Sequence, residues 1–229
     1  MRIVVLIAAS ALVAACSAST PGPAGLSQDA LTPASKSTRT TATTPAPPST
    51  AATKPPAAGA AISDVIAWIE AAAPADVTGY HTATRDGVTT ALDSDVAFAS
   101  ASGKANCMTD RQFDGALACL VDLVAPPPQP ADVYGRWKAG WVDFEGPTVE
   151  VGSAHGDPGR FGSGAGQVLG YGEALSFGDY RCRADQSGTY CVNYAHQSAV
   201  KFAESGIETF GCLTKVTPTP PDVGQKFGC

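Results

Sequence analysis

Six cysteines between residues 107 and 229 constrain the fold of this chain more than any other feature. They are Cys107, Cys119, Cys182, Cys191, Cys212 and Cys229. Six cysteines allow fifteen disulfide pairings, and the spacing favours the local ones: 107 with 119, 182 with 191 and 212 with 229. Each of these bonds would close a loop of about 10–18 residues and contribute about 3 kcal/mol to stability. Because the chain has no CxxC pair, the spacing does not indicate zinc, and we predict no metal site.

The N-terminus predicts export, which would place these cysteines in an oxidising compartment. Residues 1–15 read as a signal peptide: Arg2 supplies a positive charge, residues 3–13 are almost entirely apolar, and two alanines precede Cys16. The apolar run is too short to span a bilayer. The order Val-Ala-Ala-Cys resembles the lipobox of bacterial lipoproteins, and this resemblance implies that Cys16 is diacylated. An ordinary secretory signal followed by a cysteine is the alternative.

Residues 16–60 are expected to form a disordered stalk that begins at the lipidated Cys16. The segment 17–60 is nearly all Ala, Ser, Thr, Pro and Gly, with no aromatic residue. Such a composition cannot bury enough apolar surface to offset the entropy of ordering. The Thr- and Pro-rich part at 40–53 is compatible with O-linked sugars as well as with a plain spacer.

The globular domain is expected at residues 61–229, and it is acidic. It holds 11 Lys and Arg against 20 Asp and Glu, a formal charge of −9, while the whole chain carries −6. This charge excludes a nucleic-acid partner bound through net positive charge. It also disfavours flat contact of the domain with an anionic membrane.

The sequence predicts an α+β fold, mainly antiparallel β with one N-terminal helix, in a small extracellular domain cross-linked by disulfides. The helix is indicated by apolar residues at helical spacing, with Ser63 as its cap and Pro74 after its end: Ile62, Val65, Ile66 and Ile69. Short runs rich in strand-forming residues, separated by turns, follow at 96–99, 116–123, 141–144, 148–151, 174–182 and 189–194.

Four aromatic residues provide the first candidate binding segment: Tyr134, Trp137, Trp141 and Phe144. Exposed together, they would form a stacking platform for sugar rings or a lid over an acyl chain. Packed inside, they would only contribute to the core, as Trp and Tyr usually do.

Histidines provide the second set of candidates. Tyr194, His196 and Ser198 form a polar cluster after the second cysteine hairpin, either as a site or as a buried polar network. His155 precedes Asp157 in a Gly- and Pro-containing stretch, where a turn with the histidine bonded to the backbone competes with an acid–base site.

Two further motifs are weak. Residues 198–201 spell the SxxK of penicillin-recognising enzymes, but the accompanying SDN and KTG are absent. The Gly-rich stretch 162–166 lacks the ending of a phosphate loop and is expected to be a loose surface loop. We therefore assign no catalytic residue and no cofactor from the sequence.

The cysteine and glycine framework resembles a domain common in secreted and lipid-anchored actinobacterial proteins. The matching residues are 102–107 (SGKANC), 118–120 (ACL), 126–128 (PPP), 171–172 (YG), 180–182 (YRC) and 188–191 (GTYC). Over residues 61–229 the chain is similar to mycobacterial lipoproteins without an established activity. The resemblance implies localisation and architecture but no catalytic role. The chain departs from the wider pattern at Val133 and Ala154, where a third cysteine pair is expected.

These features predict a lipoprotein anchored on the extracytoplasmic face of the cell membrane. Its expected role is that of a non-enzymatic binding module for an envelope glycan, a lipid or a protein. The alternatives are an envelope hydrolase that uses His196 or His155, and a purely structural surface protein.

Overall fold

Strands with alternating inward and outward side chains dominate the computed structural model, which describes residues 54–156 and 158–229. The expected signal peptide, Cys16 and the predicted stalk up to residue 53 lie outside these residues. Residues 54–60, at the end of the predicted stalk, are described, and Ala60 packs against the cluster beneath the helix.

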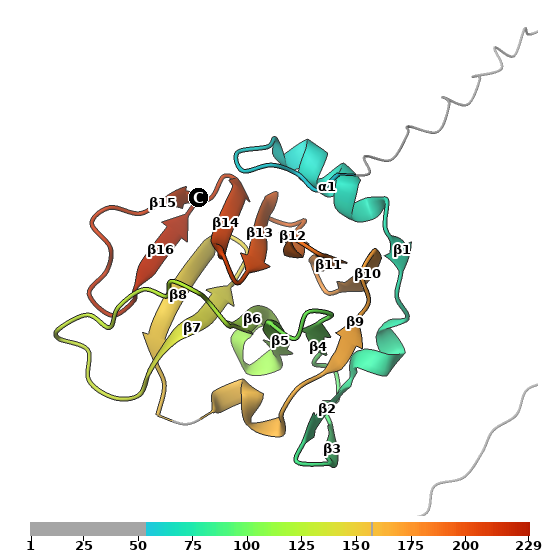
Figure 1. The fold of residues 1–229 in the computed structure, drawn as a ribbon, viewed down its shortest axis with the longest axis horizontal. Coiled ribbons are helices and arrows are strands. Elements are labelled where there is room, and N and C mark those ends of the chain that lie inside the picture. The colour runs from blue at the N-terminus through green and yellow to red at the C-terminus, as the bar shows by residue number, and fades with distance from the viewer. Residues whose placement is uncertain (1–53, 157) are drawn as a thin grey trace, which may run out of the picture. The chain divides into compact units, whose positions relative to one another are not determined.

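Two large sheets and one small hairpin hold the strands of the described part (Figure 1). The first sheet has the order β1 (Ala73–Pro74), β10 (Glu173–Phe177), β11 (Tyr180–Asp185), β12 (Gly188–Asn193), β13 (Ser198–Ala203), β14 (Gly206–Gly211). The second has the order β15 (Thr214–Lys215), β16 (Gln225–Gly228), β8 (Thr148–Ala154), β7 (Trp137–Phe144), β6 (Ala116–Val121), β5 (Ala105–Asp110), β4 (Ala97–Ser100), β9 (Gln167–Leu169). The small hairpin pairs β2 (Thr82–Arg85) with β3 (Val88–Ala91).

Pairing is antiparallel except between β1 and β10 and between β4 and β9. Within residues 54–156 and 158–229 the helical segments are one α-helix and three 3₁₀ turns: α1 (Ile62–Glu70), η1 (Val77–Tyr80), η2 (Arg111–Phe113) and η3 (Gly159–Ser163). This composition confirms the predicted α+β class.

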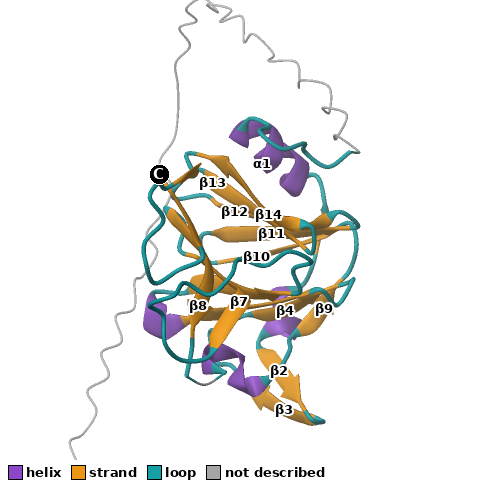
Figure 2. Cartoon of the chain, turned by 60° about the vertical axis from the view of Figure 1, so that its left-hand side comes forward, coloured by secondary structure: helices purple, strands orange, loops and turns teal. Residues whose placement is uncertain are grey.

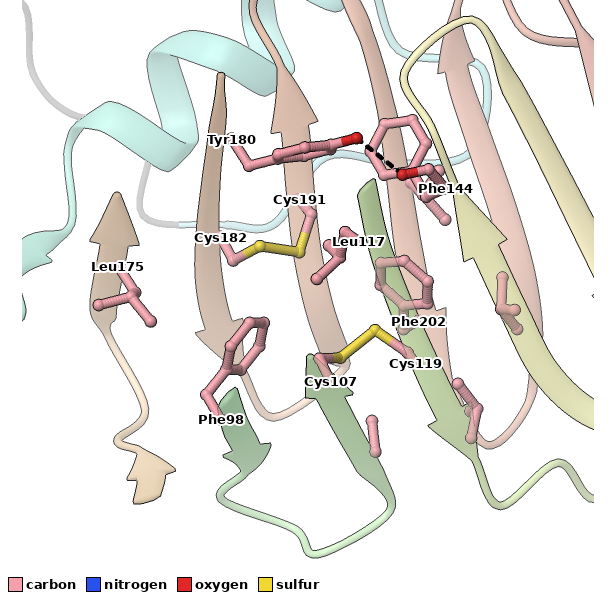
Figure 3. Packing of buried hydrophobic residues seen from close by; sticks show 14 of the residues in the cluster. Phe98, Cys107, Leu117, Cys119, Phe144, Leu175, Tyr180, Cys182, Cys191 and Phe202 are labelled. Carbon is pink, nitrogen blue, oxygen red and sulfur yellow. Dashed lines mark hydrogen bonds between the residues drawn. A yellow bond between two sulfur atoms is a disulfide. The ribbon is translucent and has the colours of Figure 1, made fainter. Parts of the chain in front are cut away.

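The two large sheets pack face to face and enclose the main core (Figure 2). Strand alternation explains which side chains point inward. Along β7, Val142 and Phe144 enter this core, whereas Trp141 belongs to a separate cluster on the outer face. Figure 3 shows Phe202 of the six-stranded sheet and Leu117 of the eight-stranded sheet, which both belong to this core.

All three predicted local disulfides are present. Cys107–Cys119 joins directly opposed residues of β5 and β6, and Cys182–Cys191 joins directly opposed residues of β11 and β12, each with a Cα–Cα distance of 4.0 Å. The four sulfurs lie in the core between the sheets (Figure 3). Cys212–Cys229 joins the residue that follows β14 to the residue that follows β16, and so closes the C-terminal segment that contains β15 and β16.

Helix α1 covers the outer face of the six-stranded sheet. Its apolar spacing buries Val65, Trp68 and Ile69 against residues of β12, β13 and β14. The predicted cap was wrong: Ala61 occupies the N-cap without a side-chain hydrogen bond, and Ser63 lies inside the helix. Pro74 follows the helix end and belongs to the edge strand β1, a position that a residue without an N–H tolerates.

Two other sequence predictions need correction. The expected strand at 174–182 is a hairpin, because Gly178 adopts a positive φ of 47° between β10 and β11. The Gly-rich stretch 162–166 is not a loose loop. Ala165 pairs with Thr84, and a Cβ at Gly166 would overlap the backbone of Ala97 in β4. The glycines therefore allow close contact between backbones.

Candidate functional site

The four aromatic candidates do not form a platform. Tyr134 is 89% exposed in the loop before β7, and Phe144 is buried in the inter-sheet core against the Tyr180 ring. Trp137 is half-buried and donates its indole N–H to the carbonyl of Pro127 at 3.3 Å. Of the four, only Trp141 lies on the outer face of the eight-stranded sheet beside polar residues, so the four rings do not share one surface.

The three residues of the predicted polar cluster point to different partners. Tyr194 donates its hydroxyl to Glu70 Oε1 of α1 at 3.0 Å. The Ser198 hydroxyl is buried and donates to the carbonyl of Gly146 at 2.6 Å. His196 is exposed in the turn before β13 and lines a separate cavity of about 510 Å³. The cluster is therefore neither a single site nor a single buried network.

Strand geometry also keeps apart the serine and the lysine of the SxxK match. Ser198 and Lys201 are three residues apart on β13, so their side chains point to opposite faces of the sheet. Lys201 instead pairs with Glu208 of β14 at 2.8 Å. The lysine therefore cannot serve as a base for the serine.

Trp141 is positioned by an irregularity in β7. The pairing of β7 with β8 shifts register between Lys138 and Val142. Gly140 lies within this interval, where a Cβ would overlap the carbonyl of Val121. The chain then resumes regular pairing, with Trp141 and Asp143 on the outer face and the Trp141 indole N–H donating to Asp143 Oδ2 at 2.8 Å.

His155 packs directly on this tryptophan. The two rings stack with centroids 3.6 Å apart, while Phe161 of η3 meets the indole edge-on at 4.9 Å. His155 Nε2 lies 2.7 Å from the Ser153 hydroxyl, and its backbone N–H donates to the carbonyl of Arg136. The side chain of His155 therefore has a hydroxyl partner, while Asp157 of the predicted turn lies outside the described residues.

Arg160 of η3 approaches the carboxylate of Asp143 at the oxygen that Trp141 does not contact. Its side chain is 8% exposed and donates to the carbonyl of Ala116 at 2.8 Å. Its guanidinium also lies over the exposed ring of Phe113, 5.2 Å from the centroid. Arg160 Nη2 stops 3.7 Å from Asp143 Oδ1, a separation longer than a hydrogen bond.

A cavity of about 450 Å³ opens beside these groups, within the size range of ligand pockets. We call it the Trp141 cavity. It is lined by Asp110, Gln112, Phe113, Trp141, Asp143, Glu145, His155, Gly159 and Arg160. Three carboxylates thus share the cavity with one guanidinium and three aromatic rings, an arrangement that favours a cationic group with an apolar stem.

Burial raises the pKa of Asp143 above the ordinary value for Asp. The hydrogen bond from Trp141 and the charge of Arg160 act in the opposite direction, while Glu150 and Glu145 reinforce the increase. The charged form of Asp143 is therefore incompletely stabilised in the free protein, and an added cation would favour it.

Sequence reasoning identified Trp141 and His155 but missed Asp143 and Arg160. The i, i+2 spacing of Trp141 and Asp143 on one strand was the available signal for the carboxylate. No local pattern places η3 over β7, so Arg160 had no corresponding signal.

The described residues contain no group of three His, Cys, Asp or Glu side chains that could hold a metal ion. Within the same residues, no helix has the length and apolar character needed to cross a membrane.

Comparisons with protein-family models, with curated proteins and with solved structures found no match to this chain. The resemblance to mycobacterial lipoproteins therefore rests on the sequence motifs alone.

Proposed function

We propose that the protein is a mycobacterial-type envelope lipoprotein, exported through residues 1–15 and anchored by acyl chains on Cys16. The lipobox-like sequence supports the anchor, and the composition of residues 16–60 supports a stalk that holds the domain away from the membrane. Two acyl chains suffice for stable attachment. Fractionation of cells tests this proposal: Cys16→Ala should move the protein from the membrane to the soluble fraction, and quantitative retention in the membrane would contradict lipid anchoring.

Within this setting the protein acts as a binding module, and the Trp141 cavity takes an amine-bearing group of an envelope peptide or protein. The observation that carries the proposal is the Asp143 carboxylate in an aromatic-lined cavity, with the Arg160 guanidinium 3.7 Å away. An ammonium group could approach Asp143 more closely than Arg160 does, and its apolar stem would contact the rings. An acyl chain fits poorly because three carboxylates line the cavity.

The amine proposal is tested with three capped tripeptides that differ only in a central Lys, Ala or Glu. Binding to the purified protein is followed by NMR through the indole N–H of Trp141. The Lys peptide should bind best, and its affinity should fall as the pH is lowered through the pKa of Asp143, because protonation removes the negative charge.

Asp143→Asn is the matching variant, because asparagine keeps an oxygen that can accept the Trp141 N–H. It should weaken binding of the Lys peptide about tenfold. Asp64→Asn makes the same charge change at an exposed position of α1, on the outer face of the other sheet, and should not change the affinity for the Lys peptide. Equal binding of all three peptides would contradict the proposal, and no binding at all would favour a structural surface role.

A hydrolase that uses His155 is the second candidate, and one distance favours it. Ser153 Oγ lies 2.7 Å from His155 Nε2, within the range of a nucleophile and its general base. Labelling with a fluorophosphonate probe tests this role. Stoichiometric labelling that disappears in Ser153→Ala would support a serine hydrolase, whereas absence of labelling in the folded protein would exclude a reactive Ser153.

A further inference from the structure

A third cavity, of about 360 Å³, is used by none of the preceding assignments. It lies where the turns β4–β5, β11–β12 and β13–β14 converge between the two sheets. We call it the hairpin cavity. Its floor is apolar and belongs to the core: Ala184 and Phe202 are each 1% exposed.

The walls of the hairpin cavity are rich in neutral groups that both donate and accept hydrogen bonds. The hydroxyl residues are Ser100, Ser102, Ser187, Thr189 and Ser205. Gln186 adds an amide. Thr189 is 2% exposed and also lines the cavity. A hydroxyl at the wall of a cavity can donate a hydrogen bond to a ligand and accept one from it.

The charged groups of the hairpin cavity already have partners within the protein. Lys104 Nζ lies 2.7 Å from Asp122 and 3.8 Å from Glu204. Asp185 Oδ1 accepts both the N–H and the hydroxyl of Ser187, at 2.9 and 2.7 Å. These contacts fix the turns, and the rest of the cavity wall is uncharged, which favours a neutral ligand.

An aromatic ring completes the hairpin cavity. Tyr171 lines it and is 49% exposed. A half-exposed ring beside hydroxyl and amide groups suits a ligand with an apolar C–H face and a rim of hydroxyl groups. The Cys182–Cys191 bond spans the hairpin that carries Asp185 and Gly188, so this wall is held by a covalent link.

We propose that the hairpin cavity is a binding site for a neutral saccharide, with Tyr171 stacking on the sugar and Thr189 bonding to one of its hydroxyl groups. This site is independent of the Trp141 cavity. It also places sugar recognition at an aromatic residue other than the four that the sequence singled out.

The test uses mannotriose, maltotriose and the trimer of N-acetylglucosamine as probes, titrated into the purified protein and followed by NMR. At least one should bind with a Kd below about 1 mM, with shifts confined to the hairpin cavity. Tyr171→Ala should weaken binding about tenfold. Tyr134→Ala removes a more exposed tyrosine outside the cavity and should leave the affinity unchanged.

Thr189→Val keeps the volume of the buried side chain and removes only its hydroxyl, and it should weaken binding several-fold. Asp143→Asn should not change saccharide binding, which separates this proposal from the amine site. The proposal is overturned if none of the three probes binds, if shifts map outside the hairpin cavity, or if Tyr171→Ala binds like the parent. Preference for a uronic-acid trisaccharide over the neutral probes would also overturn it.

Discussion

Trp68 and Trp141 lie on the outer faces of the two sheets, and they differ in the element that covers each face. Trp68 is carried by α1, meets Tyr190 edge-on at 4.8 Å and has the Arg183 guanidinium 3.7 Å from its ring centre. Trp141 is carried by the sheet itself and is covered by His155 and the short segment η3. Both rings are almost fully buried, but only Trp141 lines one of the cavities described above.

The difference follows from the covering element. A nine-residue helix with an apolar face covers a sheet continuously. Two arginines also bond to carbonyls of its C-terminal part: Arg183 donates to Trp68 and Arg181 to Glu70. A five-residue 3₁₀ turn covers less surface and leaves space beside Asp143. We call the outer face of the six-stranded sheet, which α1 covers, the sealed face; it contributes to stability. The outer face of the eight-stranded sheet is only partly covered, and a ligand can enter there.

The largest expected effect is on the sealed face. Trp68→Ala should lower the free energy of unfolding by about 3–5 kcal/mol, because it removes a fully buried ring that joins α1 to the sheet. Chemical denaturation monitored by circular dichroism measures the loss. Trp137→Ala, at a half-buried position, is the control and should cost less. Equal losses would contradict the assignment of Trp68 as the residue that holds the helix.

Replacing each ring by phenylalanine sharpens the comparison. The buried Trp68 N–H has no acceptor among the described residues, whereas the Trp141 N–H donates to Asp143. Trp141→Phe should therefore destabilise the protein by about 1.5 kcal/mol more than Trp68→Phe.

A double-mutant cycle of Trp141→Phe with Asp143→Asn isolates the hydrogen bond from the lost ring volume. The two changes should couple, so that Trp141→Phe costs less when Asp143 is already replaced. Additive losses would mean that the indole bond to Asp143 contributes nothing.

The two tryptophan faces also differ in how far the sequence predicts them. The helical spacing of Val65 and Ile69 indicates α1 and its buried face, because amphipathic periodicity is a local property. The three disulfides were predictable for a similar reason, since each joins nearby cysteines. The helix cap was missed because the helix begins at Ile62, which places Ala61, a residue without a capping side chain, at the N-cap.

The Trp141 cavity depends on contacts between segments that are distant along the chain. Arg160 reaches Ala116 and Asp143 from η3, and Phe113 comes from the turn after β5. Residue types alone did not separate Phe144 from Trp141, whereas strand alternation sends Phe144 inward and Trp141 outward. Composition therefore indicated aromatic residues but could not decide which ring would border a cavity.

The smallest expected effect is the pH dependence contributed by Asp143. Its pKa in the folded protein is raised above the unfolded value, mainly by burial. The folded state consequently binds the proton more tightly, and the stability that this provides is lost as the pH rises through the raised pKa. Asp143→Asn cannot ionise, so it should be more stable than the parent near pH 7.

Thermal unfolding at several pH values measures this effect, with Asp64→Asn as the exposed control on the sealed face. The advantage of Asp143→Asn should shrink as the pH falls and should vanish below the ordinary pKa of Asp, where both states of the parent carry the proton. An Asp143→Asn variant that is less stable than the parent at pH 7 would show that Arg160 and the Trp141 N–H fully compensate the buried charge. The carboxylate would then have no deficit for an incoming cation to relieve, and the amine proposal would lose its physical basis.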